Sequence, residues 1–433
     1  MPPPTSHADA RVVAHTATGA ESTTRPRPCT RSGRAVVVFA FLATFGLAME
    51  GVGVATAATS STEPSSGPPA GRAATGVTGS TLTVGGIVGA DASSVGADIG
   101  AQARFARANR TNEVRGRTVE YLRTESVADA AGADAAAARL ATEVFAVVPA
   151  VAPSVGAATL NRAAVPFFGA ASSAEWYANR VGFGFTGAAV TERTRVAESP
   201  IGMQLRRALG ASKAPVAVLH DDDPAGAARA AQARRSLRAA GFRKVDVIAV
   251  PLAPASFDTA ALAARPSTGV NVFLTSAART SEIVGSLVAA GSTATMVVGP
   301  EFYMPRSPSS ANGLTVLTAV APFEESTAAN RRLAADVEAF APGTPLTTAV
   351  AAGYWSADLF LRGVVATGKT LTRPRMLDAM NGERFTYAVR GTVGRSTWPE
   401  MHTQPVPCGS LAQSDGTQFI VVAPYACPPA RGG

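Results

Sequence analysis

Apolar residues fall into two patterns along this chain. Short β-rich runs occur at residues 81–88 and 118–122, and apolar positions recur at helical spacing over residues 99–108. Further strands are expected at residues 165–168, 215–219, 245–250, 270–274, 295–298 and 314–321. Further helices are expected at residues 129–146, 201–209, 225–240, 281–290, 328–340 and 349–366. Strands that alternate with helices predict an α/β fold with parallel, doubly wound sheets and right-handed crossovers.

The pattern starts again near Arg195, where a second series of strands and helices begins. A chain of 433 residues is long enough for two domains that each bury a core. From residue 385 to 427 the sequence changes to β-hairpin character, with Gly, Pro and two cysteines. We therefore expect two α/β units and a C-terminal hairpin.

The carboxyl end of the strand at residues 295–298 carries the first candidate site. The apolar run stops at a Gly-Pro step and then presents Glu301, followed by Phe302 and Tyr303. In open α/β sheets, ligands collect outside the carboxyl ends of the strands. A carboxylate held there suits a cationic group such as an ammonium, although a surface acid after a buried strand is the alternative.

Composition indicates a soluble, Ala-rich α/β protein rather than a disordered or multi-span membrane protein. Charged residues make up 16% of the chain and hydrophobic residues 46%, and the net charge is +8. The basic residues are scattered, without a block and without interleaved aromatic residues, so nucleic-acid binding is weakly supported. Motifs of hydrolases, zinc proteases and nucleotide-binding loops do not occur, and the spacing of Gly85, Gly86 and Gly89 does not match a dinucleotide-binding turn.

Residues 1–58 are expected to be a signal peptide. Arg31 and Arg34 precede the apolar run 35–48, and small residues at 54–58 offer a cleavage site near Ala57 or Ala58. No cysteine follows the run directly, so a lipid anchor is not expected, whereas an uncleaved membrane anchor stays open. Residues 59–79 are rich in Ser, Thr, Gly and Pro and are expected to form a flexible leader. The protein is therefore expected to be exported, either extracellular or associated with the cell envelope.

The cysteines support export. Cys29 lies in the segment that would be removed, which leaves Cys408 and Cys427. An even pair in an exported chain indicates a disulfide. Zinc binding by these two cysteines and His402 is a poor alternative, and no metal site is expected.

With these elements in order, residues 82–427 resemble the type I periplasmic binding proteins, and most closely their branched-chain amino-acid group, the solute receptors of ATP-driven importers. Residues 168–175 are similar to the Ala-Ala-Thr turn of that family, and residues 298–301 to its Gly-Pro-Glu turn. The helix around residues 352–358 loosely resembles its Ala-Tyr-Asp-Ala helix. The opening strand with its Gly-rich turn is generic and adds little.

The resemblance implies two Rossmann-like lobes joined by a multi-strand hinge, with the ligand between them. It places residues 80–195 and 321–385 in lobe I, residues 196–320 and 386–427 in lobe II with the hairpin, and 428–433 in a tail. One lobe would hold the carboxylate of the ligand and the other its ammonium, and hinged closure would bury it. The ligand-binding residues that it implies are Ser154, Ala170, Ala171, Ser172, Trp176, Thr275, Glu301 and Phe302.

This chain departs from the family where tyrosines usually line the site. The turn at residues 222–226 lacks the usual tyrosine, and residues 274–277 lack the aromatic residue of a later turn. The pocket for the ligand side chain is thus either lined by smaller residues than in the family or lined instead by Trp176, Tyr177, Phe302 and Tyr303. The resemblance therefore implies a small zwitterionic or carboxylate ligand that need not be Leu, Ile or Val.

The expected function is that of a monomeric solute-binding protein of an ABC-type importer, with a permease or sensor as partner, no catalysis and no cofactor. A sensing or surface module with the same fold is the alternative. A hydrolase or oxidoreductase is a further one, for which His220 with Asp221, Asp222 and Asp223 is the candidate cluster. Three acids after a strand more often cap the next helix and favour its dipole.

Overall fold

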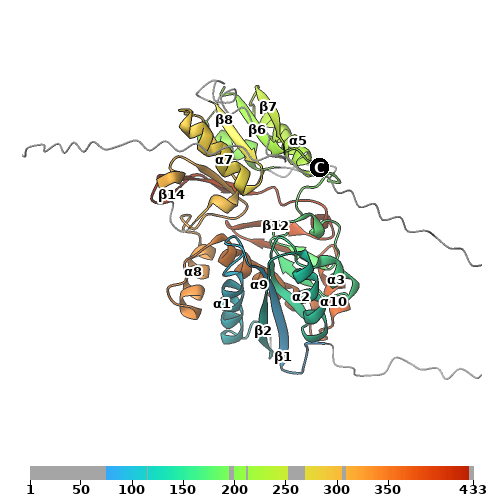
Figure 1. The fold of residues 1–433 in the computed structure, drawn as a ribbon. Helices are drawn as coiled ribbons and strands as arrows, with labels where there is room; N and C mark the ends of the chain where they lie inside the picture. Colours follow the sequence, from blue (N-terminus) through green and yellow to red (C-terminus); the bar gives the residue numbers. More distant parts are fainter. Residues whose placement is uncertain are drawn as a thin grey trace, which may run out of the picture. The chain divides into compact units, whose positions relative to one another are not determined.

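The computed structural model describes residues 75–114, 116–194, 199–210, 213–251, 269–304 and 309–428. The expected signal peptide (1–58), all but the last five residues of the leader (59–79) and all but the first residue of the tail (428–433) lie outside these ranges. Helix and strand numbers follow Figure 1.

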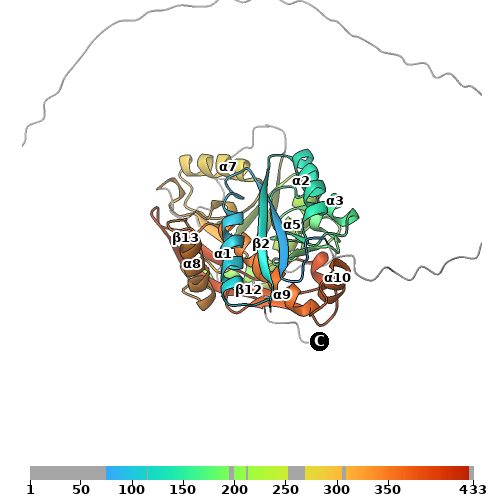
Figure 2. The same cartoon turned by 90° about the horizontal axis from the view of Figure 1, so that it is seen from below.

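The first sheet has five parallel strands in the order β2-β1-β3-β4-β5. Its strands are β1 (Thr81–Gly89), β2 (Thr118–Val127), β3 (Ala146–Val151), β4 (Phe167–Gly169) and β5 (Gly182–Gly184). Helices from both ends of the chain surround it. Those that contact its strands are α1 (Ala97–Arg110), α2 (Ala130–Glu143) and α9 (Thr348–Thr367), and those that pack on these helices are α3 (Ala157–Arg162), α8 (Ala328–Phe340) and α10 (Arg373–Met380). In Figure 2, α1 and α8 lie on one side of β1 and β2, and α2 and α3 lie on the other. This is the doubly wound arrangement expected from the sequence.

The second sheet has seven strands in the order β14-β13-β10-β9-β8-β6-β7. The strands are β6 (Val216–Asp221), β7 (Val245–Val250), β8 (Val270–Leu274), β9 (Thr295–Val298), β10 (Thr315–Thr318), β13 (Gly409–Ser414) and β14 (Phe419–Ala426). Strands β6 to β10 pair in parallel, whereas β13 and β14 join as an antiparallel hairpin at the edge. Its helices are α4 (Ile201–Leu209), α5 (Pro224–Ala239) and α7 (Ala277–Ala289). Two lobes of parallel α/β structure confirm the predicted fold class.

Close backbone contact between α1 and α9 fixes the core of the first lobe. A Cβ on Gly353 would lie 1.7 Å from the carbonyl oxygen of Ala97, and one on Gly100 would lie 1.9 Å from that of Val350. Each helix therefore needs a glycine where the other crosses it. These two glycines let the helices approach until Ala97 and Val350 are buried between them.

The hairpin of β11 (Thr386–Val389) and β12 (Val393–Thr397) belongs to the core of the first lobe. Tyr387, Val393 and Trp398 are buried in the same hydrophobic cluster as α1 and α9. The sequence analysis places the change of lobe at residue 386, but the buried side chains stay with the first lobe through Cys408. We therefore propose that the chain returns to the second lobe only as it enters β13.

Four elements of the first lobe are missing from the sequence-based prediction: β3, α3, β5 and α10. Strand β3 follows α2 after two residues, so the apolar pattern of the helix runs into that of the strand. Strand β5 has only three residues, Gly-Phe-Gly. A short strand of this kind carries no period, and its place in the sheet depends on its partner β4.

A disulfide joins Cys408 to Cys427, with the Cα atoms 4.1 Å apart, which confirms the predicted pairing. Cys408 is 3% exposed and lies against Gly394 of β12. The bond therefore ties the end of β14 to the start of β13, next to the first-lobe hairpin.

We expect the Cys408→Ser/Cys427→Ser variant to lose about 3 kcal/mol of folding free energy, because the bond closes a loop of 19 residues. Urea unfolding of both proteins would measure the difference. Alkylation without reductant should leave the mass of the native protein unchanged at both cysteines, and labelling of the pair would contradict the bond.

Candidate ligand site

The first sheet brings the two predicted carboxylate-binding turns together. Strands β3 and β4 are neighbours, with Ala150 paired to Gly169, so the turns that follow them leave the same edge of the sheet. Ser154 lies in the turn after β3, and Ser172 lies in the turn after β4. The predicted first-lobe residues therefore form one group at the carboxyl ends of the strands.

Glu175 joins these two turns and was not recognised from the sequence. Its carboxylate accepts hydrogen bonds from the backbone N–H of Val155 at 2.6 Å and of Ala157 at 3.3 Å, next to the first turn of α3. The hydroxyls of Ser154 and Ser173 also donate to it, each at 3.3 Å. Its position three residues after Ser172 matches the Ser-x-x-Glu capping pattern, which could have signalled a capping role. The hydroxyl of Ser154 is thus engaged within the protein.

The turn after β4 combines backbone strain with a free hydroxyl. Ala171 has a φ of 52°, which places a residue with a Cβ in the left-handed region, and its side chain is 4% exposed. The Thr186 hydroxyl donates to the carbonyl of Ala170 and holds this conformation. Such strain tends to occur at functional sites. The Ser172 side chain is exposed, and its hydroxyl has no hydrogen-bond partner within the described part of the chain.

Trp176 lies beneath this turn rather than on its surface. The side chain is 2% exposed, and its ring centroid is 4.6 Å from that of Phe167 in the hydrophobic core of β3 and β4. A Cβ on Gly169 would lie 2.8 Å from the indole, so the ring fills the space under β4. Packing explains the position of Trp176, and we leave it out of the proposed ligand contacts.

In the second sheet, the turn after β9 presents Glu301 as predicted. The residue is exposed, but its carboxyl group lies back over the backbone of Gly299, where a Cβ would approach Oε2 to 2.3 Å. Loss of hydration at this position raises the pKa of the carboxyl group, and the one opposing hydrogen bond comes from the backbone of Glu301 itself. Within the described residues, Glu301 has no cationic partner. A carboxylate that has lost water and gained no counter-charge favours a cationic ligand.

The two aromatic residues after Glu301 differ in role. Tyr303 is 5% exposed, and its hydroxyl donates to the carboxylate of Glu324 and accepts from the N–H of Phe323 at 2.8 Å. Burial, together with Glu324, raises the pKa of Tyr303. Phe302 is only partly buried against the core of the second lobe. Tyr303 therefore anchors the turn, and Phe302 is the ring that can border a ligand.

Thr275, after β8, reaches the same edge of the second sheet as Glu301, but its side chain has a partner. It is 8% exposed, and its hydroxyl lies 2.7 Å from that of Thr280 in the first turn of α7. Strands β8 and β9 are parallel neighbours, which explains the common edge. Thr275 shapes this edge rather than offering a free hydroxyl.

Three residues of the cluster at the end of β6 make local structural contacts. Asp223 caps α5 by accepting from the N–H of Gly226, and Asp221 accepts from the N–H of Ser276 at 2.9 Å. Nδ1 of His220 lies 2.8 Å from the carbonyl oxygen of Asp221. These contacts match helix capping and turn formation, the alternative noted from the sequence.

The described ranges hold neither a metal-binding cluster nor a membrane-spanning helix. They contain no group of three or more His, Cys, Asp or Glu side chains that could hold a metal ion. The same ranges contain no helix that is both long and apolar enough to cross a membrane.

A profile of periplasmic binding proteins matches residues 78–418, most of the chain. The protein belongs to the periplasmic binding proteins. This confirms the resemblance seen in the Ala-Ala-Ser turn and the Gly-Pro-Glu turn, and it places the matched region outside the expected signal peptide. No curated protein matches the chain in sequence at a significant level.

Solved structures of this family share the fold at low sequence identity. A fatty acid ABC transporter substrate-binding protein from Thermomonospora curvata is 15% identical, with a TM-score of 0.63 over 83% of this chain and 95% of that one. A solute-binding protein from R. palustris in complex with 4-hydroxybenzoate is 17% identical, with a TM-score of 0.58 over 80% and 97%. The branched-chain amino acid transporter substrate-binding protein LivJ from Streptococcus pneumoniae, in complex with isoleucine, is 16% identical, with a TM-score of 0.57 over 79% and 99%.

Proposed function

We propose that this periplasmic binding protein is the extracytoplasmic, monomeric receptor of an ABC-type importer and captures a small amino acid or amino-acid-like solute by closure of its lobes. The family match supports solute binding. The structures of similar fold are named as transporter substrate-binding proteins, which supports a membrane permease as the partner.

The carboxyl group of Glu301 carries this proposal. It stands at the carboxyl end of β9, is partly desolvated over Gly299 and has no cation beside it within the described residues. An ammonium group of the ligand would supply that counter-charge through short, charge-assisted hydrogen bonds. This feature favours a ligand with an amine over a simple carboxylate, although the similar structures are named for isoleucine, 4-hydroxybenzoate and fatty acid.

The turn after β4 is the proposed partner for the ligand carboxylate. Ser172 offers an exposed hydroxyl, and the backbone of Ala171 is already in the left-handed region, next to Ala170, whose carbonyl accepts from the Thr186 hydroxyl. Ser154 contributes through its turn, since Glu175 already engages its hydroxyl. Phe302 completes the proposed set as a ring that borders the ligand, and Thr275 as a residue that shapes the neighbouring edge of the sheet. This set requires neither a cofactor nor a catalytic residue.

We expect Ser172→Ala to weaken ligand binding by about 1.5 to 3 kcal/mol, because it removes one hydrogen bond to a charged group. A thermal-shift screen with the twenty amino acids would identify the tightest binder, and calorimetry with that compound would compare the variant with the native protein. Ser281→Ala, an exposed serine on α7, is the matched control. Equal affinity in both variants would contradict the role of Ser172.

A further inference from the structure

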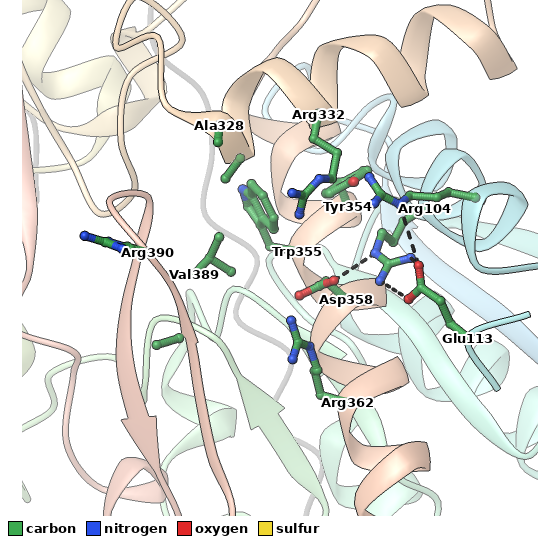
Figure 3. A pocket seen from close by; sticks show the side chains of 13 residues that line it. Arg104, Glu113, Ala328, Arg332, Tyr354, Trp355, Asp358, Arg362, Val389 and Arg390 are labelled. Carbon is green, nitrogen blue, oxygen red and sulfur yellow. Dashed lines mark hydrogen bonds and ion pairs between the residues drawn. The ribbon is translucent and has the colours of Figure 1, made fainter. Parts of the chain in front are cut away.

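A pocket in the first lobe shares no residue with the candidate ligand site. It has a volume of about 420 Å³ and is bordered by α1, α8, α9 and the β11–β12 hairpin. Figure 3 shows its lining, with Trp355 and Tyr354 of α9 beside it. Both aromatic residues are 3% exposed or less, so they form a fixed floor. A volume of this size is in the range of small-molecule sites.

The pocket is lined by five arginines but only two carboxylates. Arg104 donates to Asp358 at 2.8 Å and to Glu113 at 2.6 Å, so both carboxylates of the lining are paired with the same arginine. Arg107 lies 3.3 Å from Asp336. These pairs account for the arginines that come from α1.

Three other arginines remain without a partner among the described residues: Arg332 on α8, Arg362 on α9 and Arg390 in the β11–β12 turn. In Figure 3, Arg332 and Arg362 extend from their helices toward the space beside Trp355 and Asp358. All three are exposed. Arg390 extends away from Trp355 in Figure 3, whereas Arg332 and Arg362 bring two positive charges to one concavity, and such charges repel each other and attract anions.

The first turn of α8 offers backbone N–H donors beside these arginines. Ala328 and Ala329 line the pocket, and the N–H groups at the start of a helix have no partner within it. The Thr327 hydroxyl satisfies the N–H of Asn330 at 3.0 Å, but no partner is described for those of Ala328 and Ala329. The N-terminus of a helix also carries partial positive charge.

We propose that this pocket binds a phosphate group, presented by a small phosphorylated molecule or by a phospholipid headgroup. A single carboxylate brings one negative charge, whereas phosphate brings about −1.5 to −2 at pH 7 and several acceptor oxygens. It can therefore accept from Arg332, Arg362 and the first turn of α8 at the same time. The network of Arg104, Asp358 and Glu113 holds α1 and α9 in place beside it.

The test is calorimetric titration of the full-length protein with inorganic phosphate at constant ionic strength. We expect the double variant Arg332→Gln/Arg362→Gln to bind phosphate at least about tenfold more weakly, because each arginine contributes a charge-assisted bond. The double variant Arg234→Gln/Arg235→Gln, which changes two exposed arginines of α5, should bind as the native protein does. Equal heats of binding in the two double variants, or none in the native protein, would overturn the proposal.

Two further arms identify the source of the phosphate. Sedimentation with vesicles of phosphatidylglycerol, lost in the Arg332→Gln/Arg362→Gln variant and retained in the control, would identify a headgroup. Binding of glycerol 3-phosphate without sedimentation, again lost only in that variant, would identify a soluble molecule. Because Glu301 and Ser172 lie outside this pocket, Glu301→Gln should leave phosphate binding unchanged, and this separates the proposal from the proposed function.

Discussion

Arg104→Met is expected to destabilise the first lobe by about 3 to 5 kcal/mol, the cost of leaving a buried charge without its partner. Arg104 is 5% exposed, and its guanidinium connects Asp358 of α9 to Glu113, which follows α1. Burial alone would lower the pKa of Arg104, but Asp358 and Glu113 raise it overall. In the variant, the one hydrogen bond left to the Asp358 carboxylate from the described residues is that of the Tyr387 hydroxyl, which donates to it at 3.2 Å.

Urea unfolding, followed by tryptophan fluorescence, would measure this loss. Arg139→Met is the matched control, since Arg139 forms a salt bridge with Glu125 but is itself exposed. Exposed ion pairs contribute little, so the control should unfold close to the native protein. The double variant Arg104→Met/Asp358→Leu should recover much of the loss, because no charge is then buried alone. A loss of less than about 1 kcal/mol in Arg104→Met would contradict a structural role for the pair.

Glu301→Gln is expected to weaken binding of an amine-bearing ligand by about 1.5 to 3 kcal/mol, because the amide replaces a charged acceptor with a neutral one of the same shape. Stability should change little, since the carboxyl has no protein cation to lose within the described residues. Glu282→Gln, an exposed glutamate on α7, is the matched control.

The pKa of Glu301 gives the same site a pH dependence. Partial loss of hydration over Gly299 raises the pKa of the carboxyl group above its ordinary value of 4.5, so Glu301 becomes protonated at a higher pH than a fully hydrated glutamate. An ammonium binds the ionised form, so affinity should fall as the pH falls through the raised pKa, and binding should release a proton in that range. Calorimetry in two buffers of different ionisation enthalpy would detect this release. It should vanish in Glu301→Gln.

The second half of the chain shows how much of the fold its sequence makes predictable. Strands β7, β8 and β9 are found at their expected bounds, and β6 starts one residue and ends two residues later than expected. Each is a short run of mostly apolar residues that ends at polar or turn residues, which makes it predictable. Helix α5 is also found as expected, with Asp223 as its cap. In the first lobe, β3 and β5 depend on neighbouring strands for their place, so no local pattern could reveal them.

In the candidate site, the sequence made the two turns predictable but not the side-chain contacts around them. The turns with Ser172 and Glu301 could be recognised because both directly follow apolar strands and carry family-like motifs. The sequence did not reveal which aromatic side chains are buried. Trp176 is buried against Phe167, and Tyr303 is buried against Phe323, and each partner lies on another segment of the chain. The same holds for Glu175, whose partners depend on the pairing of β3 with β4.

The most direct test of the central claim compares an amino acid with its desamino analogue. Leucine and 4-methylpentanoate form one such pair, and the tightest amino acid from the screen and its own analogue would form the decisive one. We predict that the native protein binds the amino acid at least about tenfold more tightly than the analogue, and that Glu301→Gln abolishes this preference. Equal affinity of the native protein for both compounds would contradict the assignment of Glu301 as the ammonium-binding residue.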